Sequence, residues 1–402
     1  NAERRHVSGT LKEEISLLGV IMAGGRGTRL MPLTNNRPKP MVPVLGRPVL
    51  DYVKDAMVGA GLKQIVVTTG YKGKEISSHV ESWNQNDVVA WVNQESTPMG
   101  TAGSVRLLMQ EIEETIVVGS GDSVASFDVM DLIETHKKHQ AAVTMAIWEV
   151  EDPTEYGIVG LSDTQGGRVD GNLKEGFIVK FKEKPSAEEA FSRVINAGLY
   201  IIEPHVIEMI PEGEKYDFSK QLFPMVLEAG LPMYAKTIDG IWFDVGHPLE
   251  LLKAQKALIQ NKDKLPFPMP SGRVLDDGSF ISSTAEVRGQ VFSSVISGDC
   301  VITENSVVKN SLINHTGGIS KKQNLEYLRN WHWMWSKFYY NKKHYGYLTA
   351  LTKTSHHLIS SILKYFLYIL LFNKHRKKVY KMRFLGLFNS IIGNKSFLRP
   401  DS

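Results

Sequence analysis

The stretch LGVIMAGGRGTRLMPLTNNRPKPMVPVLGRP, residues 18–48, decides how the chain is interpreted. Its apolar start, up to Met22, predicts a buried β-strand, and a glycine-rich loop follows directly. A strand that ends in such a loop presents backbone N–H groups to an anion. Two cations, Arg29 and Lys39, follow ten residues apart. The stretch therefore predicts a loop that binds a polyphosphate.

Two familiar phosphate-binding motifs do not fit this loop. The dinucleotide fingerprint requires G-x-G-x-x-G, but Leu30 stands where the third glycine would be. The P-loop requires four residues between its glycines and then Gly-Lys-Ser/Thr, and this spacing is also absent. An ordinary strand-to-loop turn, in which glycines only supply positive φ, is the plain alternative for a double glycine alone. The length of the motif argues against that alternative.

Residues 17–258 alternate apolar, β-rich runs with amphipathic stretches. Strand candidates are QIVVTTGY (64–71), TIVVGSGD (115–122) and AAVTMAIWEV (141–150), and a helix is predicted over 128–140. This alternation predicts an α/β fold with a mostly parallel sheet covered by helices. Ligands of such sheets bind beyond the carboxyl ends of the strands, where the motifs of this chain also fall.

The string GGRGTRLMPLTNNRPKPMVPV (24–44) resembles the signature of the sugar-1-phosphate nucleotidyltransferases. The segments GTAG (100–103) and IWFDVGHP (241–248) are more similar to mannose-1-phosphate guanylyltransferases and NDP-sugar synthases. The resemblance implies a Rossmann-like fold with helices on both faces of the sheet. It also implies transfer of a nucleotidyl group from an NTP to a hexose 1-phosphate, with Mg²⁺ as cofactor. Glucose-1-phosphate thymidylyl- or uridylyltransferase, and a non-catalytic nucleotide-sugar sensor on the same fold, are the alternatives.

This reaction joins two anions, so the protein must neutralise and align them. The resemblance assigns Arg29 to the β- and γ-phosphates, Lys39 to the α-phosphate and Lys184 to the sugar phosphate. Asp122 and Asp244 match the positions that bind the metal, which suits the oxygen ligands that Mg²⁺ prefers. Taken alone, each aspartate would more readily be interpreted as a cap or turn residue.

Two further groups of residues are predicted from the resemblance. Nucleotide binding is assigned to the glycine-rich loop and to QESTPMGTAG (94–103), with the residues Ala23, Gly24, Gly25, Gly27, Thr28, Gln94, Gly100, Thr101 and Ala102. Sugar-phosphate binding is assigned to three later segments, with the residues Tyr156, Gly157, Glu183, Lys184, Asn196, Gly198 and Tyr200. Gly100 is expected to let the backbone approach the base. Trp242 either lines the sugar pocket or belongs to the core.

The rest of the chain divides by composition. We expect an N-terminal extension over 1–16, a Pro-rich linker over 259–270, a β-helix over 271–316 and a tail over 317–402. In the third of these, apolar residues recur every six positions at Val295, Val301, Val307 and Ile313. Ile281 and Val287 keep the same interval, but the register slips before Val295. A six-residue repeat predicts a left-handed β-helix, here a partial one. Two irregular strands are the alternative.

The tail differs from the rest of the chain in charge. Residues 317–402 hold 16 Lys and Arg against 2 acidic residues, whereas residues 1–316 hold 31 against 41. The apolar run LISSILKYFLYILLF (358–372) precedes the basic cluster 374–378. At fifteen residues it is too short for a confident membrane span. The combination predicts a helix that lies on an anionic membrane surface. A helix packed in a core or against a partner is the alternative, and no motif indicates nucleic-acid binding.

The tail also carries a resemblance of its own. The strings RNWHWMWSKFYYNKKHYGYL (329–348) and KMRFLGLFNSIIGNKSFLRP (381–400) resemble the C-terminal end of bacterial family 2 glycosyltransferases of the rhamnosyltransferase type. The similarity covers 322–400 and does not include that family's catalytic domain. It implies a chimera whose two parts join near residues 316–322.

Composition limits the cellular setting. At 42% hydrophobic and 22% charged residues, the chain is globular rather than disordered. A single cysteine, Cys300, excludes an internal disulfide framework and fits a reducing compartment. Residues 1–16 do not have the apolar pattern of a signal peptide, and the first residue, Asn1, leaves open that the chain is a fragment. We expect a cytoplasmic protein, peripheral at the inner membrane surface through its tail, that forms homo-oligomers.

Overall fold

The computed structural model describes three parts of the chain: residues 17–261 except 26, 32, 35–36, 71–72 and 86; residues 271–313; and residues 323–393. The predicted extension over 1–16, nearly all of the linker and the predicted join at 316–322 lie outside these ranges. The chain forms two compact units, Asn1–Asn314 and His315–Ser402. Each unit is described by itself.

Within the described residues, the first unit is built on a nine-stranded sheet in the order β5-β4-β1-β6-β11-β8-β12-β10-β9. The strands are β1 (Leu18–Met22), β4 (Gln64–Thr69), β5 (Val89–Gln94), β6 (Ile116–Ser120), β8 (Val143–Glu149), β9 (Gly157–Ser162), β10 (Glu175–Glu183), β11 (Val194–Ile202) and β12 (Met233–Thr237). β5, β4, β1 and β6 are parallel, and β12 is parallel to β8. The remaining neighbours are antiparallel. The sheet is therefore mixed, and the expectation of a mostly parallel sheet holds only for its first half.

The difference has a simple cause. A parallel neighbour requires a crossover connection, usually a helix, whereas an antiparallel neighbour requires only a loop. Helices α1 (Leu50–Gly59), α2 (Gly73–Glu81) and α3 (Gly100–Arg106) separate the strands of the first half. No helix lies between β8 and β11, so these strands return directly and pair antiparallel. The alternation that predicts a parallel sheet ends at that point.

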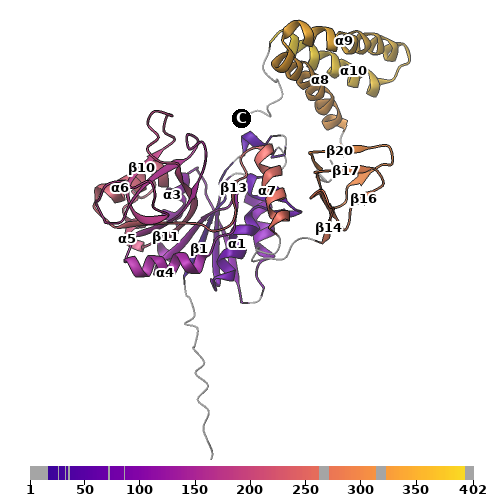
Figure 1. Ribbon diagram of the computed structural model, residues 1–402. Helices are drawn as coiled ribbons and strands as arrows, with labels where there is room; N and C mark the ends of the chain where they lie inside the picture. Colours follow the sequence, from indigo (N-terminus) through magenta and orange to yellow (C-terminus); the bar gives the residue numbers. More distant parts are fainter. Residues whose placement is uncertain are drawn as a thin grey trace, which may run out of the picture. The chain divides into compact units, whose positions relative to one another are not determined.

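Helices cover both faces of the sheet, in agreement with the prediction (Figure 1). On one face, α1, α2 and α4 (Val129–His139) contribute buried side chains to the same cluster as Ile21 of β1. On the other, α3, α5 (Pro204–Glu208) and α6 (Phe223–Glu228) pack with Val20. Asp128 starts α4 by accepting a hydrogen bond of 3.0 Å from the backbone of Asp131. Adjacent residues of β1 thus face opposite layers.

The first unit continues through α7 (Pro248–Gln260) into a series of short strands. β15 (Phe280–Ser282), β18 (Val295–Ile296) and β21 (Leu312–Ile313) form one parallel ladder, in which Phe280 pairs with Val295 and Val295 with Leu312. β16 (Glu286–Val287) pairs with β19 (Val301–Ile302), and β17 (Gln290–Phe292) with β20 (Val307–Lys309), both in parallel. This coil-on-coil stacking is that of a β-helix.

Four of the six predicted inward-facing positions of the β-helix, Ile281, Val287, Val295 and Ile313, pack into the interior, and two do not. Val301 and Val307 are exposed, at 57% and 56%, whereas Ile302 and Val308 pack into the interior. The ladders pair residues 15 or 17 positions apart, not the 18 of three six-residue repeats. Because the coils are shorter than a regular repeat, the apolar positions that face inwards shift by one residue.

The described part of the second unit consists of α8 (Gln323–Tyr345), α9 (Tyr347–Leu370) and α10 (Lys374–Ile391). Its small core contains Met334, Phe338, Ala350 and Leu387. Gly386 lets α10 approach α8, because a Cβ there would lie 2.1 Å from the carbonyl oxygen of Trp331. Among the described residues, no helix combines the length and the apolar character needed to cross a membrane.

Candidate active site

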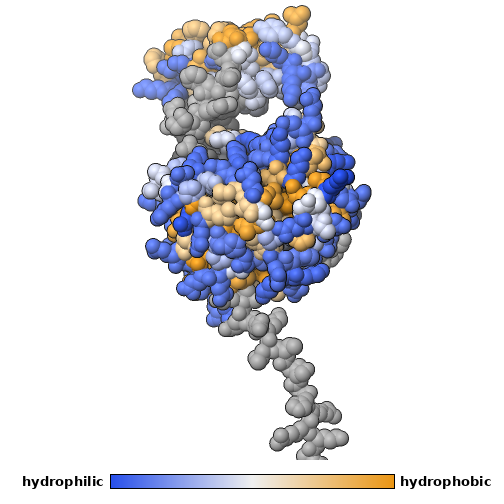
Figure 2. Space-filling view, turned by 90° about the vertical axis from the view of Figure 1, so that its left-hand side faces the viewer, coloured by the Kyte–Doolittle hydropathy of each residue, from blue (hydrophilic) through white to orange (hydrophobic). Residues whose placement is uncertain are grey.

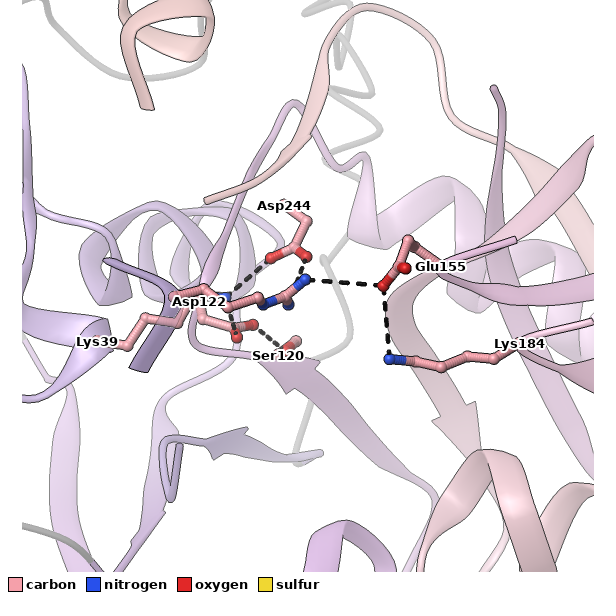
Figure 3. Close-up of polar contacts among 7 residues, drawn as sticks. Lys39, Ser120, Asp122, Glu155, Lys184 and Asp244 are labelled. Atoms are coloured by element: carbon pink, nitrogen blue, oxygen red, sulfur yellow. Dashed lines mark hydrogen bonds and ion pairs between the residues drawn. The ribbon is translucent and has the colours of Figure 1, made fainter. Parts of the chain in front are cut away.

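Three predicted residues from distant parts of the sequence meet at the carboxyl end of β6. Asp122 follows β6 directly, and the pairing of β7 (Ser123–Ala125) with β13 (Trp242–Asp244) places Asp244 opposite Ser123. The Nζ atom of Lys39 lies 2.6 Å from Asp122 Oδ2 and 2.9 Å from Asp244 Oδ1 (Figure 3). We call Lys39, Asp122 and Asp244 the lysine–aspartate cluster. Its two carboxylates converge on one cation.

Local sequence explains why Lys39 reaches this position. Pro38 precedes it in an extended conformation, and Pro40 follows in a short 3₁₀ turn, Lys39–Met41. Gly27 adopts a φ of 65°, and a Cβ on it would lie 2.8 Å from the Cβ of Lys39. Thr34 donates a hydrogen bond of 2.7 Å to the carbonyl of Gly27. The glycine-rich loop is therefore packed against the stem of Lys39.

The electrostatics of the cluster favour the charged forms of Lys39 and Asp122, but not that of Asp244. Burial acts to lower the pKa of Lys39, but attraction to Asp122 and Asp244 outweighs it and holds the pKa above its usual value. Burial acts to raise the pKa of Asp122, but Lys39 and a 2.5 Å hydrogen bond from Ser120 hold it below the usual range. Burial and repulsion from Asp122 raise the pKa of Asp244. Asp244 is thus the carboxylate with the greater need of a further cation.

A second set of charges lies beside the cluster and is open to solvent. The guanidinium of Arg29 lies 3.8 Å from Asp244 and 4.0 Å from Glu155, and Lys184 lies 3.9 Å from the same Glu155 oxygen (Figure 3). The side chains of Arg29, Glu155 and Lys184 are 61%, 68% and 53% exposed. We call these three residues the exposed ion-pair chain. It brings two predicted phosphate-binding cations toward one another across a carboxylate.

Glu155 was not predicted from the sequence. Glu155 directly precedes Tyr156, which was predicted to bind the sugar phosphate. A carboxylate next to a predicted site residue is the signal that could have indicated it. β9 and β10 are antiparallel with Gly157 opposite Glu183, and the Lys184 N–H donates to the Tyr156 carbonyl at 2.9 Å. This pairing brings Glu155 near Lys184. The register of the two strands was needed to see it.

The predicted sugar-phosphate residues have different surroundings: Lys184 is exposed, whereas Tyr200 is buried and hydrogen-bonded to Asn196. Burial, together with the nearby Asp217, raises the pKa of Glu183. Asn196 donates to the hydroxyl of Tyr200 at 2.8 Å, and its own side-chain oxygen accepts from the Gly198 N–H at 2.9 Å. Tyr200 is buried in the core. We therefore interpret Tyr200 as a positioning residue for Asn196.

An irregular segment of β11 fixes the neighbourhood of Asp122. The register with β8 shifts between Asn196 and Tyr200, and Gly198 has a φ of 82°. A Cβ on Gly198 would lie 3.1 Å from the Cβ of Ser120, the residue that hydrogen-bonds Asp122. Trp242 is buried and donates from its indole nitrogen to the Ala197 carbonyl at 2.8 Å. Of the two alternatives for Trp242, the structure shows the core residue.

The GTAG segment has a structural task that the sequence did not reveal. Gly100 has a φ of 79°, and a Cβ there would lie 2.4 Å from the carbonyl oxygen of Tyr216. The same carbonyl accepts hydrogen bonds of 3.0 Å from the backbone of Ala102 and Gly103. The hydroxyl of Thr101 donates to Asp217 at 3.1 Å. Gly100 thus admits the backbone of Tyr216, and its approach to a base stays a prediction.

The other predicted nucleotide-binding residues lie at the carboxyl ends of β1 and β5. Ala23 is buried and donates its backbone N–H to Thr68. Gly24, Gly25, Thr28 and Gln94 are exposed, and a Cβ on Gly24 or Gly25 would meet no atom within 4 Å. This edge of the parallel half is therefore open. Arg26 lies outside the described residues.

Comparison with known proteins agrees with this geometry. Residues 18–261 match the family model described as nucleotidyl transferase. This chain belongs to the nucleotidyl transferase family. The match covers more than half of the chain and confirms the family predicted from the glycine-rich motif, and with it the prediction of a transferase enzyme.

Individual relatives have different names. A UTP–glucose-1-phosphate uridylyltransferase from Synechocystis is 29% identical over 73% of this chain and 82% of its own length. A mannose-1-phosphate guanylyltransferase catalytic subunit beta from Drosophila pseudoobscura is 32% identical over 58% and 60%. A solved structure from Bacillus anthracis, assigned as a glucose-1-phosphate thymidylyltransferase, is similar in fold, with a TM-score of 0.52 and 22% identity. It covers 60% of this chain and 94% of that one.

Proposed function

We propose that this nucleotidyl transferase joins an NTP to a hexose 1-phosphate, giving an NDP-sugar and pyrophosphate. The observation that carries the proposal is the lysine–aspartate cluster at the carboxyl end of β6, with Arg29 and Lys184 beside it. Two anionic substrates that react with one another need several fixed cations and convergent carboxylates for a metal. The site combines both.

The carboxylates suit Mg²⁺ held together with substrate. Asp122 and Asp244 both contact the Lys39 ammonium, and neither is fully buried, at 32% and 23% side-chain exposure, so a metal ion could bind beside Lys39 on their exposed oxygens. In the described part of the chain, no group of three or more His, Cys, Asp or Glu side chains could hold a metal by itself. Mg²⁺ commonly takes one or two carboxylates and completes its shell with phosphate oxygens and water. Bound there, the ion would neutralise charge that develops on the phosphates.

The protein's own groups have separable tasks in this reaction. An oxygen of the sugar phosphate attacks the α-phosphorus of the NTP, and pyrophosphate leaves from the opposite side. Lys39 supplies a positive charge at the α-phosphate, while the planar fork of Arg29 suits the departing β- and γ-phosphates. Lys184 holds the attacking sugar phosphate, and Glu183 and Asn196 accept or donate hydrogen bonds to sugar hydroxyls. Alignment and charge neutralisation provide the catalysis.

We propose GTP and mannose 1-phosphate as the substrates. The GTAG and IWFDVGHP segments, and a 32% identical relative named as a mannose-1-phosphate guanylyltransferase, support this pair. The Synechocystis relative supports UTP and glucose 1-phosphate as the second pair. A non-catalytic sensor is not favoured, because Arg29, Lys39, Asp122, Lys184 and Asp244 are all present.

Pyrophosphate release tests the proposal. The full chain would be incubated with Mg²⁺, each of ATP, GTP, CTP, UTP and dTTP separately, and mannose or glucose 1-phosphate. We expect release with GTP and mannose 1-phosphate. Release only with another pair would replace the proposed substrates and keep the reaction. Release with no pair, from protein shown to be folded by circular dichroism, would contradict the proposed activity.

A further inference from the structure

Helix α9 packs in the reverse of the usual manner. The residues it buries most are small or polar: Ala350, Thr354 and Ser361. Large apolar side chains recur every three or four positions on the exposed side, at positions Ile359, Ile362, Leu363, Phe366, Leu367 and Leu370. We call these six the apolar stripe of α9. A helix in a water-soluble unit normally turns such residues toward its core.

The turn after α9 extends the exposed apolar surface. Leu371 and Phe372 are exposed, at 60% and 91%, in the link between α9 and α10 (Figure 1). Figure 2 shows hydrophobic residues among hydrophilic ones along the upper edge of the helical unit. A continuous exposed apolar surface indicates a site of interaction. The three described helices leave the stripe uncovered, so its partner is not one of them.

Positive charge follows the stripe directly. Asn373 caps α10 by accepting a hydrogen bond of 2.9 Å from the backbone of Arg376. Basic side chains fill the first two turns of α10, at positions Lys374, Arg376, Lys377, Lys378 and Lys381. Cations at the amino end of a helix oppose the helix dipole, so they destabilise α10 unless an anion lies nearby. The partner of this end of the unit is therefore expected to be anionic as well as apolar.

Aromatic residues lie between the apolar and the basic groups. Tyr368 of α9 stacks on Tyr380 of α10, with ring centroids 5.5 Å apart. Arg376 donates to the Tyr368 hydroxyl at 2.9 Å, and Lys364 lies over the Tyr380 ring at 5.4 Å. Rings with one apolar and one polar end are typical of the boundary between lipid tails and headgroups. They also hold the α9–α10 hairpin together at this end.

We infer that the hairpin of α9 and α10 docks on an anionic lipid bilayer, with the apolar stripe of α9 among the acyl chains and the basic turns of α10 on the headgroups. The apolar run is too short to span the bilayer, so the helix lies in the interfacial plane. Residues 323–393 contain 12 Lys and Arg and a single acidic residue, Glu326. This charge opposes docking of a second copy of the same unit and favours anionic lipid.

Flotation of the full chain with lipid vesicles tests the inference. Vesicles of phosphatidylcholine alone and of phosphatidylcholine with phosphatidylglycerol would be compared at low and high salt. We expect the protein to float with the anionic vesicles at low salt, and less at high salt. Protein that remains at the bottom with both vesicles, or floats equally with both, would overturn the inference.

Paired variants separate the two contributions. The double variant Phe366→Gln with Leu370→Gln removes apolar surface and should weaken flotation. The double variant Lys374→Gln with Lys381→Gln removes two charges, and for it we expect a roughly 30-fold weaker partition onto the anionic vesicles. Lys342→Gln with Lys343→Gln, at the far end of α8, is the charge-matched control. Val301→Gln with Val307→Gln, on the β-helix, is the apolar control. Both control variants should float as the unmodified chain does. If a control lost as much flotation as the variant that it matches, the assignment would be contradicted.

Self-association is the competing outcome and is measured separately. Light scattering without lipid would show a dimer that Phe366→Gln with Leu370→Gln dissociates. A dimer of this kind that does not float would assign the stripe to a second copy and overturn the lipid assignment. Pyrophosphate release by each variant reports on the first unit only, so its outcome is independent of the flotation result.

Discussion

The lysine–aspartate cluster and the exposed ion-pair chain are neighbours, joined by the contact between Asp244 and Arg29, yet they differ in burial and in contact length. In the cluster, Lys39 is 8% exposed and its contacts are 2.6 and 2.9 Å long. In the exposed ion-pair chain, the side chains of Arg29 and Lys184 are more than half exposed, and their contacts are 3.8 to 4.0 Å long. Short buried ion pairs fix geometry, whereas long exposed ones are screened by water and exchange partners easily. The site thus combines a rigid centre with an adaptable rim.

The largest effect is expected from the carboxylates of the rigid centre. Asp122→Asn or Asp244→Asn would remove a metal-binding charge and lower turnover by about 10³-fold or more. Steady-state pyrophosphate release at saturating substrate measures this loss. Asp276→Asn, at an exposed position before the β-helix strands, is the matched control and should retain full turnover. A folded Asp122→Asn protein with unchanged turnover would contradict the assignment of the metal site.

The substitution Lys39→Met tests how strongly the lysine–aspartate cluster stabilises the protein. It leaves two partly exposed carboxylates facing one another, so the free energy of unfolding should fall by about 3 kcal/mol at pH 7. Lys39 holds the pKa of Asp122 below its unfolded value, so this stabilisation is present at neutral pH and is lost as pH falls through the native pKa. Urea unfolding from pH 7 down to about pH 3, below the ordinary pKa of an aspartate, should therefore show the variant approaching the unmodified chain. A difference that grows on acidification would contradict this.

Arg29→Lys would separate charge from shape at the rim. It keeps the positive charge but loses the planar fork, so kcat/KM should fall by about 10-fold. Stability should not change, because Arg29 is largely exposed. Comparing kcat/KM with the urea midpoint measures the two effects separately. A loss of stability as large as that of Lys39→Met would show that the rim is as rigid as the centre.

The smallest effect is expected from Glu155→Gln. Glu155 competes with anionic substrates for Arg29 and Lys184, so its neutralisation should lower KM for the sugar phosphate by up to about 3-fold. The effect should shrink at high salt because the groups are exposed. Glu188→Gln, an exposed change of equal charge, is the control and should leave KM unaltered. A raised KM would mean that Glu155 itself contacts substrate.

The sequence predicted several residues that the structure brings together, but it did not predict their contacts. The motif around Lys39 indicated the family, which the comparisons confirm, and the alternation of strands and helices predicted the parallel half of the sheet. It did not show that Lys39 binds both aspartates, because Asp122 and Asp244 are far apart in the chain and meet only through the pairing of β7 with β13. Glu155 was missed for the same reason.

Other differences arise where packing overrides a regular pattern. The interval of six predicts the existence of the β-helix coils, but shorter coils turn Ile302 inwards in place of Val301. The amphipathic pattern of α9 is visible in the sequence, whereas the side that it buries is decided by the close approach of the neighbouring helices. The packing of Gly100 against the Tyr216 backbone could not be predicted, because it depends on a residue far along the chain.

One feature of the core bears on the order in which the molecule folds. Leu30 and Val42, which flank the segment with Lys39, share a buried cluster with Leu251 of α7 and with Phe280 and Val295 of the β-helix. These residues lie near opposite ends of the first unit, so their contacts form late and slowly. During synthesis, the segment with Lys39 leaves the ribosome early but waits for the β-helix to complete its packing. The packing that surrounds the Lys39 segment is therefore complete only after the β-helix has been synthesised.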